Sequence, residues 1–225
     1  MIVIFDLDDT LYNEIDFVKS GFNKVSIYLA QEYKLDKEKV YKKLCTVLNK
    51  FGRGKVFNLC LMEFNIYSKE IVRKCLSIYR THKPYISLPA ESIKVLTTLA
   101  KENTLYVVTD GNKIVQQNKI AALKINNYVK KAMPTHNYGL KSSKPSIYCF
   151  ELIRKIEKTK FNKLVYIGDN PIKDFVNIKK AHINTIRINQ GMFKDLFLTK
   201  EYSADYKVEK LSDIIPIINK LKIEK

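Results

Sequence analysis

The stretch that decides the fold lies at Met1–Leu11 and reads MIVIFDLDDTL. Ile2–Phe5 is a short run of apolar residues, which is typical of a strand buried on both faces. Polar residues follow at once, with Asp6, Asp8 and Thr10 spaced two apart. Because open α/β sheets bind their ligands at the carboxyl ends of strands, this order predicts a site at the edge of a parallel sheet.

The same alternation of strand and helix continues through the C-terminal part of the chain. Further strands are predicted at Leu105–Thr109, Val129–Met133, Leu164–Ile167, Asn184–Ile188 and, as an edge strand, Tyr206–Val208. Helical patterns fall between them, at Ala90–Lys101, 113–123, Ser146–Glu157, Asp174–Ala181 and Leu211–Leu221. This order predicts the α/β class: a Rossmann-like parallel sheet core with helices on both faces.

The stretch Asp16–His82 has a different pattern, in which apolar residues recur only at helical spacing. Asp36 and Ser68 are suited to cap two of its helices, and Phe51–Lys55 interrupts it with two glycines. We therefore predict two domains: an α/β core over 1–15 and 83–225, and a small all-helical domain over 16–82.

Composition narrows the class of protein. Of 225 residues, 46% are apolar and 28% charged, which are ordinary values for a globular chain. The formal charge of +17 would suit a nucleic-acid binder, but it comes from 35 lysines and only 5 arginines. Arginine supplies the planar fork that reads nucleic acids, so we expect no nucleic-acid partner and assign the lysines to solvated surface. The positive field would still attract small anionic substrates.

Compartment and redox chemistry are predicted from what the chain lacks. No apolar run approaches the ~18 residues of a membrane span, and the first residues lack the pattern of a signal peptide. We expect no membrane partner and a cytoplasmic location. Cys45, Cys60, Cys75 and Cys149 form no C-x-x-C pair or zinc spacing, so free thiols are expected.

Four polar groups lie at strand ends or in the loops beside them. They are Asp6-x-Asp8-x-Thr10, Thr109-Asp110-Gly111-Asn112, Lys144-Pro145, and Gly168-Asp169 with Asp174. Each alone has an ordinary structural interpretation as a turn, a strand end or a helix start. Together, in this order at strand ends, they predict a catalytic site.

These motifs resemble those of the haloacid dehalogenase superfamily of phosphohydrolases. The resemblance extends from Met1 to about Ile218, and the helical stretch matches the cap that many members insert after the first motif. Thr109–Asn112 followed by Gln116–Ile120 is similar to the branch that acts on small metabolites, which includes sugar-phosphate phosphatases and nucleotidases. Members of that branch more often carry Asn where this chain has Asp110.

The resemblance implies a role for each of the first two carboxylates. Asp6 would attack phosphorus and form an aspartyl-phosphate, because a carboxylate with a reference pKa of about 3.9 is ionised at neutral pH. Asp8 would donate a proton to the leaving oxygen and then activate water. The presence of Asp8 argues against a dehalogenase, since a departing halide needs no acid.

The resemblance also implies the remaining site residues. Magnesium, a hard cation, would be held by Asp6, the carbonyl of Asp8, Asp169 and Asp174. Lys144 would offset the crowded negative charge, and phosphate oxygens would bind Lys144, the Thr109 hydroxyl and the backbone amides of Asp110 and Gly111. The predicted activity is a magnesium-dependent phosphatase for a small phosphorylated metabolite.

Several alternatives stay open. A nucleotidase or phosphomutase of the same superfamily would carry the same motifs, and a catalytically silent module would bind a phosphate ligand without turnover. The helical insertion disfavours a polynucleotide-end phosphatase. Arg53 and Lys55, in the glycine-flanked turn, are candidate specificity residues, because Lys cannot supply the fork with which Arg binds a carboxylate or a second phosphate. The sequence predicts neither the particular substrate nor the oligomeric state.

Overall fold

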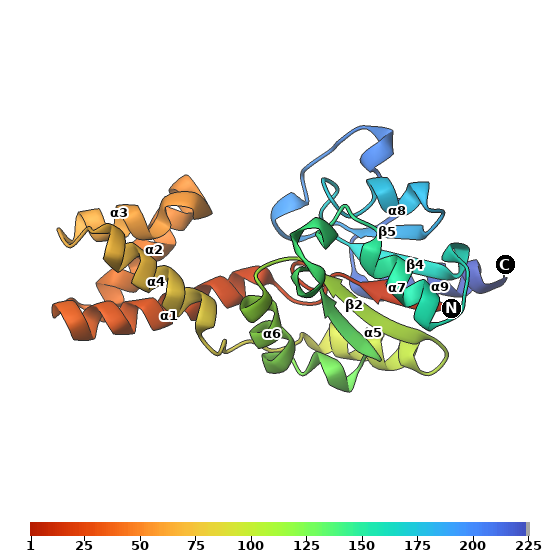
Figure 1. Ribbon diagram of the computed structural model, residues 1–225, viewed down its shortest axis with the longest axis horizontal. Helices are drawn as coiled ribbons and strands as arrows, with labels where there is room; N and C mark the ends of the chain where they lie inside the picture. The colour runs from red at the N-terminus through yellow and green to blue at the C-terminus, as the bar shows by residue number, and fades with distance from the viewer. Residues whose placement is uncertain (224–225) are drawn as a thin grey trace. The chain divides into compact units, whose positions relative to one another are not determined.

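A computed structural model describes residues 1–223. The chain divides into two compact units, one formed by Met1–Glu14 together with the chain from Ser87 onwards, the other by Ile15–Ile86 (Figure 1). Among the described residues, no helix is both long and apolar enough to cross a membrane.

The first unit contains a six-stranded sheet in the order β3-β2-β1-β4-β5-β6, with every neighbouring pair parallel. The strands are β1 (Ile2–Phe5), β2 (Thr104–Thr109), β3 (Lys131–Pro134), β4 (Leu164–Gly168), β5 (Asn184–Ile188) and β6 (Tyr206–Val208). The helices of this unit are α5 (Ala90–Ala100), α6 (Lys113–Ala122), α7 (Tyr148–Ile156), α8 (Val176–Lys180) and α9 (Ile214–Ile223). The predicted α/β class is confirmed.

Both faces of the central strands are buried, which explains why these strands are continuous apolar runs. Ile2, Ile4, Tyr106 and Val108 pack in one cluster with side chains of α7 and α8. The alternate residues of the same strands are buried too, and α5 contacts β2 while α6 contacts β3. β1 therefore lies at the centre of the sheet, and Asp6 follows it directly.

The second unit is helical, with α1 (Glu14–Tyr33), α2 (Lys37–Phe51), α3 (Val56–Glu63) and α4 (Lys69–Thr81). Asp36 and Ser68 cap α2 and α4, as predicted, by accepting hydrogen bonds from Lys39 N and Ile71 N. The unit has its own buried core, drawn from all four helices. Its role as a cap stays a prediction.

Several element boundaries differ from the sequence-based prediction by one to three residues. α9 starts at Ile214 and not Leu211, because Leu211–Asp213 form a separate 3-10 turn. β3 starts at Lys131 and not Val129, because the Val129 amide donates to Ile125 O within the preceding turn. α8 starts only at Val176, since Asp174 N donates to Asn170 O and closes a separate turn. α7 starts at Tyr148 and not Ser146, because the Ser146 amide donates to Ser143 O within a separate turn.

Candidate active site

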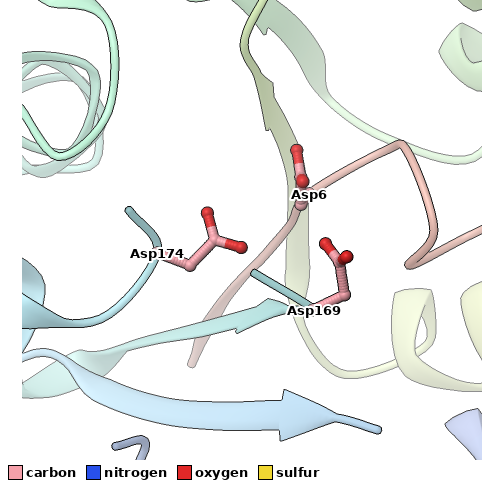
Figure 2. A group of neighbouring side chains, drawn as sticks. All are labelled: Asp6, Asp169 and Asp174. Carbon is pink, nitrogen blue, oxygen red and sulfur yellow. The ribbon is translucent and has the colours of Figure 1, made fainter. Parts of the chain in front are cut away.

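Three carboxylates meet at the carboxyl edge of the sheet. Asp6 follows β1, and its amide donates to Ile167 O in the neighbouring strand β4 at 2.8 Å. Asp169 follows β4, and Asp174 reaches the same place from the turn beyond it. One carboxylate oxygen from each of the three lies within 4.8 Å of the other two. Figure 2 shows Asp6 and Asp169 at strand ends, with the Asp174 carboxyl group directed towards them.

Lys144 connects two of these carboxylates. Its Nζ lies 2.7 Å from Asp174 Oδ1 and 3.0 Å from Asp6 Oδ1, and it donates to the Tyr166 hydroxyl at 2.7 Å. The Lys144 side chain has no solvent exposure. An unpaired ammonium in such a place would be very costly, so these contacts fix both the position and the charge of Lys144.

Burial and mutual repulsion shape the acidity of the cluster. Burial, reinforced by Asp6 and Asp174, raises the pKa of Asp169 to about 9. Burial also raises the pKa of Asp6 to about 6, against the opposing effect of Lys144. For Lys144 burial opposes the charge, but Asp174 and Asp6 more than compensate and raise its pKa. The raised pKa values indicate that Lys144 alone does not neutralise the negative charge of the three carboxylates.

The cluster fits a magnesium ion. When Asp6, Asp169 and Asp174 are all ionised, Lys144 offsets one of the three negative charges, and a divalent cation would neutralise the rest. Carboxylate oxygens are the hard ligands that magnesium prefers. The Asp174 carboxyl group is fixed in place, because its Oδ2 accepts a hydrogen bond from Asn170 N at 3.0 Å.

Gly168 makes room for this arrangement. A Cβ atom at Gly168 would lie 2.5 Å from Asp174 Oδ2 and 3.2 Å from the Tyr166 ring. Any side chain there would displace the carboxylate. The glycine in the Gly168-Asp169 motif is thus required by close approach within the cluster.

The predicted phosphate-binding segment lies at the end of β2. Thr109 is buried and its hydroxyl donates to Gln116 Oε1 at 3.3 Å. Gly111 has a φ of 137°, a backbone conformation that favours glycine. The Asp110 carboxylate accepts from Thr135 Oγ1 at 2.6 Å and from Lys144 N at 3.1 Å. The Asp110 side chain thereby anchors the Lys144 loop, which leaves its backbone amide as the group predicted to bind phosphate.

The Asp8 carboxylate accepts hydrogen bonds from three side chains, those of Tyr12, Gln116 and Lys119, for which the sequence predicted no role. The Lys119 ammonium lies 2.7 and 2.8 Å from its two oxygens, the Tyr12 hydroxyl donates to Oδ1 at 2.7 Å, and Gln116 Nε2 donates to Oδ2 at 3.1 Å. Gln116 and Lys119 are three residues apart on α6 and so share a face. That spacing, in a segment that follows the predicted phosphate-binding loop, was the sequence signal that could have indicated their contact with Asp8.

Comparison with known proteins places this geometry in a family. Residues 3–188 match the model of the haloacid dehalogenase-like hydrolases. The chain belongs to this family. The sequence-based identification of the superfamily is confirmed, and so is the predicted enzyme class, a phosphatase of this superfamily.

Curated relatives of this haloacid dehalogenase-like hydrolase are named as phosphatases. A glyceraldehyde 3-phosphate phosphatase of Methanocaldococcus jannaschii is 30% identical over 98% of this chain and 97% of its own length. One from Pyrococcus furiosus is 22% identical over 97% of this chain and 93% of its own. The pyrophosphatase PpaX of Bacillus mycoides is 24% identical, with 97% of each chain covered.

Solved structures show the same fold. The magnesium-bound hydrolase YfnB of Bacillus subtilis matches with a TM-score of 0.67 and 17% identity, covering 97% of this chain and 98% of its own. A 2-haloacid dehalogenase of Pseudomonas syringae matches with a TM-score of 0.67 and 20% identity, over 97% and 98% of the two chains. At these identities the likeness concerns the fold alone.

The two candidate specificity residues of the hydrolase lie in its helical unit. Arg53 and Lys55 are exposed in a short 3-10 turn between α2 and α3. Arg53 lines a cavity of about 220 Å³ together with apolar side chains that include Phe22, Phe57 and Tyr79. The structure thus gives Arg53 a pocket of its own unit, and a role towards substrate stays a prediction.

Proposed function

We propose that this hydrolase is a magnesium-dependent phosphatase that cleaves a small phosphorylated metabolite, such as a sugar phosphate, through an aspartyl-phosphate on Asp6. The observation that carries the proposal is the buried Asp6 carboxylate, which contacts Lys144 at 3.0 Å and has an oxygen within 4.8 Å of two further carboxylates at the strand edge. The names of the relatives support the substrate class and make glyceraldehyde 3-phosphate the first compound to test.

The chain's own residues would carry the reaction in two steps. In the first, an Asp6 oxygen attacks phosphorus while Asp8 gives its proton to the leaving oxygen. In the second, Asp8 removes a proton from water, which attacks phosphorus and releases Asp6. Thr109 and the amides of the 109–111 segment would hold the phosphate oxygens through both steps.

Lys144 and the metal ligands would govern the charge at the reacting centre. Lys144 keeps Asp6 oriented and offsets negative charge as phosphate arrives. Asp6, Asp169, Asp174 and the carbonyl of Asp8 would hold the ion, and bound magnesium would supply positive charge to offset that of the carboxylates and the phosphate. The helical unit would act as the cap, with Arg53 and Lys55 contacting the part of the substrate away from the scissile phosphate.

A substrate screen tests the proposal directly. Purified protein with magnesium should release phosphate from glyceraldehyde 3-phosphate and related sugar phosphates, and excess chelator should abolish this release. Pyrophosphate, nucleotides and a pair of interconvertible sugar phosphates belong in the same screen, because they identify a pyrophosphatase, a nucleotidase and a phosphomutase. Binding of phosphorylated compounds without turnover of any would identify a silent binding module and overturn the proposal.

Asp6→Asn tests the covalent step. The amide is nearly isosteric but a poor nucleophile, so phosphate release should become undetectable while the protein stays folded. Turnover within tenfold of the parent would contradict an aspartyl-phosphate on Asp6.

A further inference from the structure

Two lysines are buried within residues 1–223, and both lie against the predicted catalytic carboxylates. One is Lys144, which the motif already contains. The other is Lys119, on α6, whose side chain is only 2% exposed. A lysine is almost never buried unless it is paired, so the burial of Lys119 requires acidic partners close to its ammonium.

The partner of Lys119 is chiefly Asp8. Its Nζ is almost equidistant from the two Asp8 oxygens, at 2.7 and 2.8 Å, and it contacts Glu14 Oε1 more weakly at 3.3 Å. A cation that bridges both oxygens fixes the carboxylate plane as well as its distance. The Asp8 side chain is itself 19% exposed, so it is not held by packing alone.

Two neutral donors complete the support. Tyr12 is buried, and its hydroxyl donates to Oδ1 of Asp8, which lies four residues earlier in the chain. Gln116 is also buried, and its amide donates both to Asp8 Oδ2 at 3.1 Å and to Asp110 O at 2.9 Å, while its carbonyl accepts from Thr109. Gln116 thereby ties the Asp8 carboxylate to the predicted phosphate-binding segment.

The position at which α6 begins determines where Gln116 and Lys119 lie relative to Asp8. Asn112 caps the helix, and its Oδ1 accepts from Ile114 N and Val115 N. The helix thus begins immediately after the 109–111 segment, and its first and second turns present Gln116 and Lys119 on one face. The same element that ends the phosphate-binding loop positions the acid–base residue.

We infer that Lys119, together with Gln116 and Tyr12, is a positioning residue that holds the Asp8 carboxyl group where it exchanges a proton with the leaving oxygen and with water. The inference rests on the proposed function. In the first step the Asp6–phosphorus bond forms, the bond from phosphorus to the leaving oxygen breaks, and a proton that Asp8 has taken up before the step passes to that oxygen. This leaves Asp8 as the ionised carboxylate that Lys119, Gln116 and Tyr12 hold, ready to accept a proton from water in the second step. A carboxyl group misplaced by about 1 Å would transfer the proton poorly and lose on the order of 100-fold in rate.

Substrates with different leaving groups distinguish a positioning role from a merely structural one, because a structural defect would lower the rates for all of them equally. A nitrophenolate departs without needing a proton, whereas an alkoxide needs one. Lys119→Met, which removes the ammonium and keeps the length of the side chain, should lower kcat/KM for an alkyl phosphate such as glycerol phosphate by ~30–100-fold. For 4-nitrophenyl phosphate the loss should stay within about fivefold. The quantity compared is kcat/KM, because it covers the first chemical step and excludes hydrolysis of the aspartyl-phosphate.

Matched variants make the result specific. Lys222→Met removes a lysine that contacts Glu102 at 2.8 Å, away from Asp8, and should change neither rate. Lys119→Arg restores a cation and should recover part of the alkyl-phosphate activity. Tyr12→Phe removes one donor without changing shape and should give a loss of about threefold to tenfold, again confined to the alkyl phosphate. Tyr12→Phe carries the test alone if Lys119→Met does not fold.

Asp8→Asn separates failure of this inference from failure of the proposed function. If Asp8→Asn spares the alkyl phosphate, Asp8 is not the acid and the proposed function is wrong at that step. If Asp8→Asn loses the alkyl phosphate selectively but Lys119→Met and Tyr12→Phe lower both substrates equally or neither, Asp8 is the acid and the positioning inference is overturned.

Discussion

Replacing Lys144 by methionine should strongly destabilise the metal-free protein. The Lys144 ammonium is fully buried and contacts Asp174 at 2.7 Å and Asp6 at 3.0 Å. Removing one partner of a buried ion pair costs about 3–5 kcal/mol, because the remaining charge is left without compensation. Methionine fills nearly the same volume, so little of the loss should come from a cavity.

Thermal unfolding in excess chelator measures this cost. For a chain of this size a loss of 3 kcal/mol lowers the Tm by roughly 6–12 °C. Added magnesium should raise the Tm of Lys144→Met more than that of the parent, since Asp6 and Asp174 in the variant lack the buried ammonium that contacts both of them.

Lys222→Met is the matched control for stability. Its lysine pairs with Glu102, whose side chain is 74% exposed, and exposed pairs contribute about 0–1 kcal/mol. If Lys144→Met melted in chelator within about 2 °C of the parent, the carboxylate cluster could not depend on Lys144 for its charge balance, and the reasoning would be wrong.

Three further predictions concern single changes. In chelator, Asp169→Asn should be more stable than the parent at pH 9 and should lose that advantage towards pH 5. The pKa of Asp169 is raised to about 9 in the folded protein, so ionisation of this carboxyl group lowers the stability of the parent as the pH rises from about 4 through 9. Profiles of Tm against pH for both proteins test this. Gly168→Ala should lose more than 100-fold in phosphatase activity and bind magnesium more weakly by calorimetry, because its Cβ would displace Asp174 Oδ2, 2.5 Å away. Arg53→Ala should raise KM for the natural substrate at least tenfold while sparing a small aryl phosphate, and equal losses on both would indicate a structural role.

The fold could be predicted from the sequence because its pattern is continuous and local. Strands buried on both faces are unbroken apolar runs, and they alternate with helices along the chain. Boundaries were less predictable where backbone hydrogen bonds decide them. Val129 is apolar and buried like a strand residue, yet its amide bonds within a turn, and no side-chain pattern reports that difference.

The site divides in a similar way. The motif carboxylates could be placed at one sheet edge because carboxyl ends of parallel strands meet there. The direction in which each side chain points could not be predicted from the sequence. Asp110 belongs to the predicted phosphate segment, but its carboxylate points to Thr135 and to the amide of Lys144, which are 25 and 34 residues away along the chain. Only the folded topology brings those donors to it.

Lys119 shows why a strongly basic sequence can conceal a residue that lies against the predicted catalytic carboxylates. The chain has 35 lysines, of which Lys119 and Lys144 are the buried ones within residues 1–223, and one more lysine in a helix carries no distinguishing signal in the sequence. Lys144 could be singled out because Pro145 follows it in a motif, whereas Lys119 has no such neighbour. Burial separates the two from the rest, since the cost of burying an ammonium is tolerated where carboxylates must be held in place. In a lysine-rich hydrolase of this family, the buried lysines are therefore the first residues to test beyond the motifs.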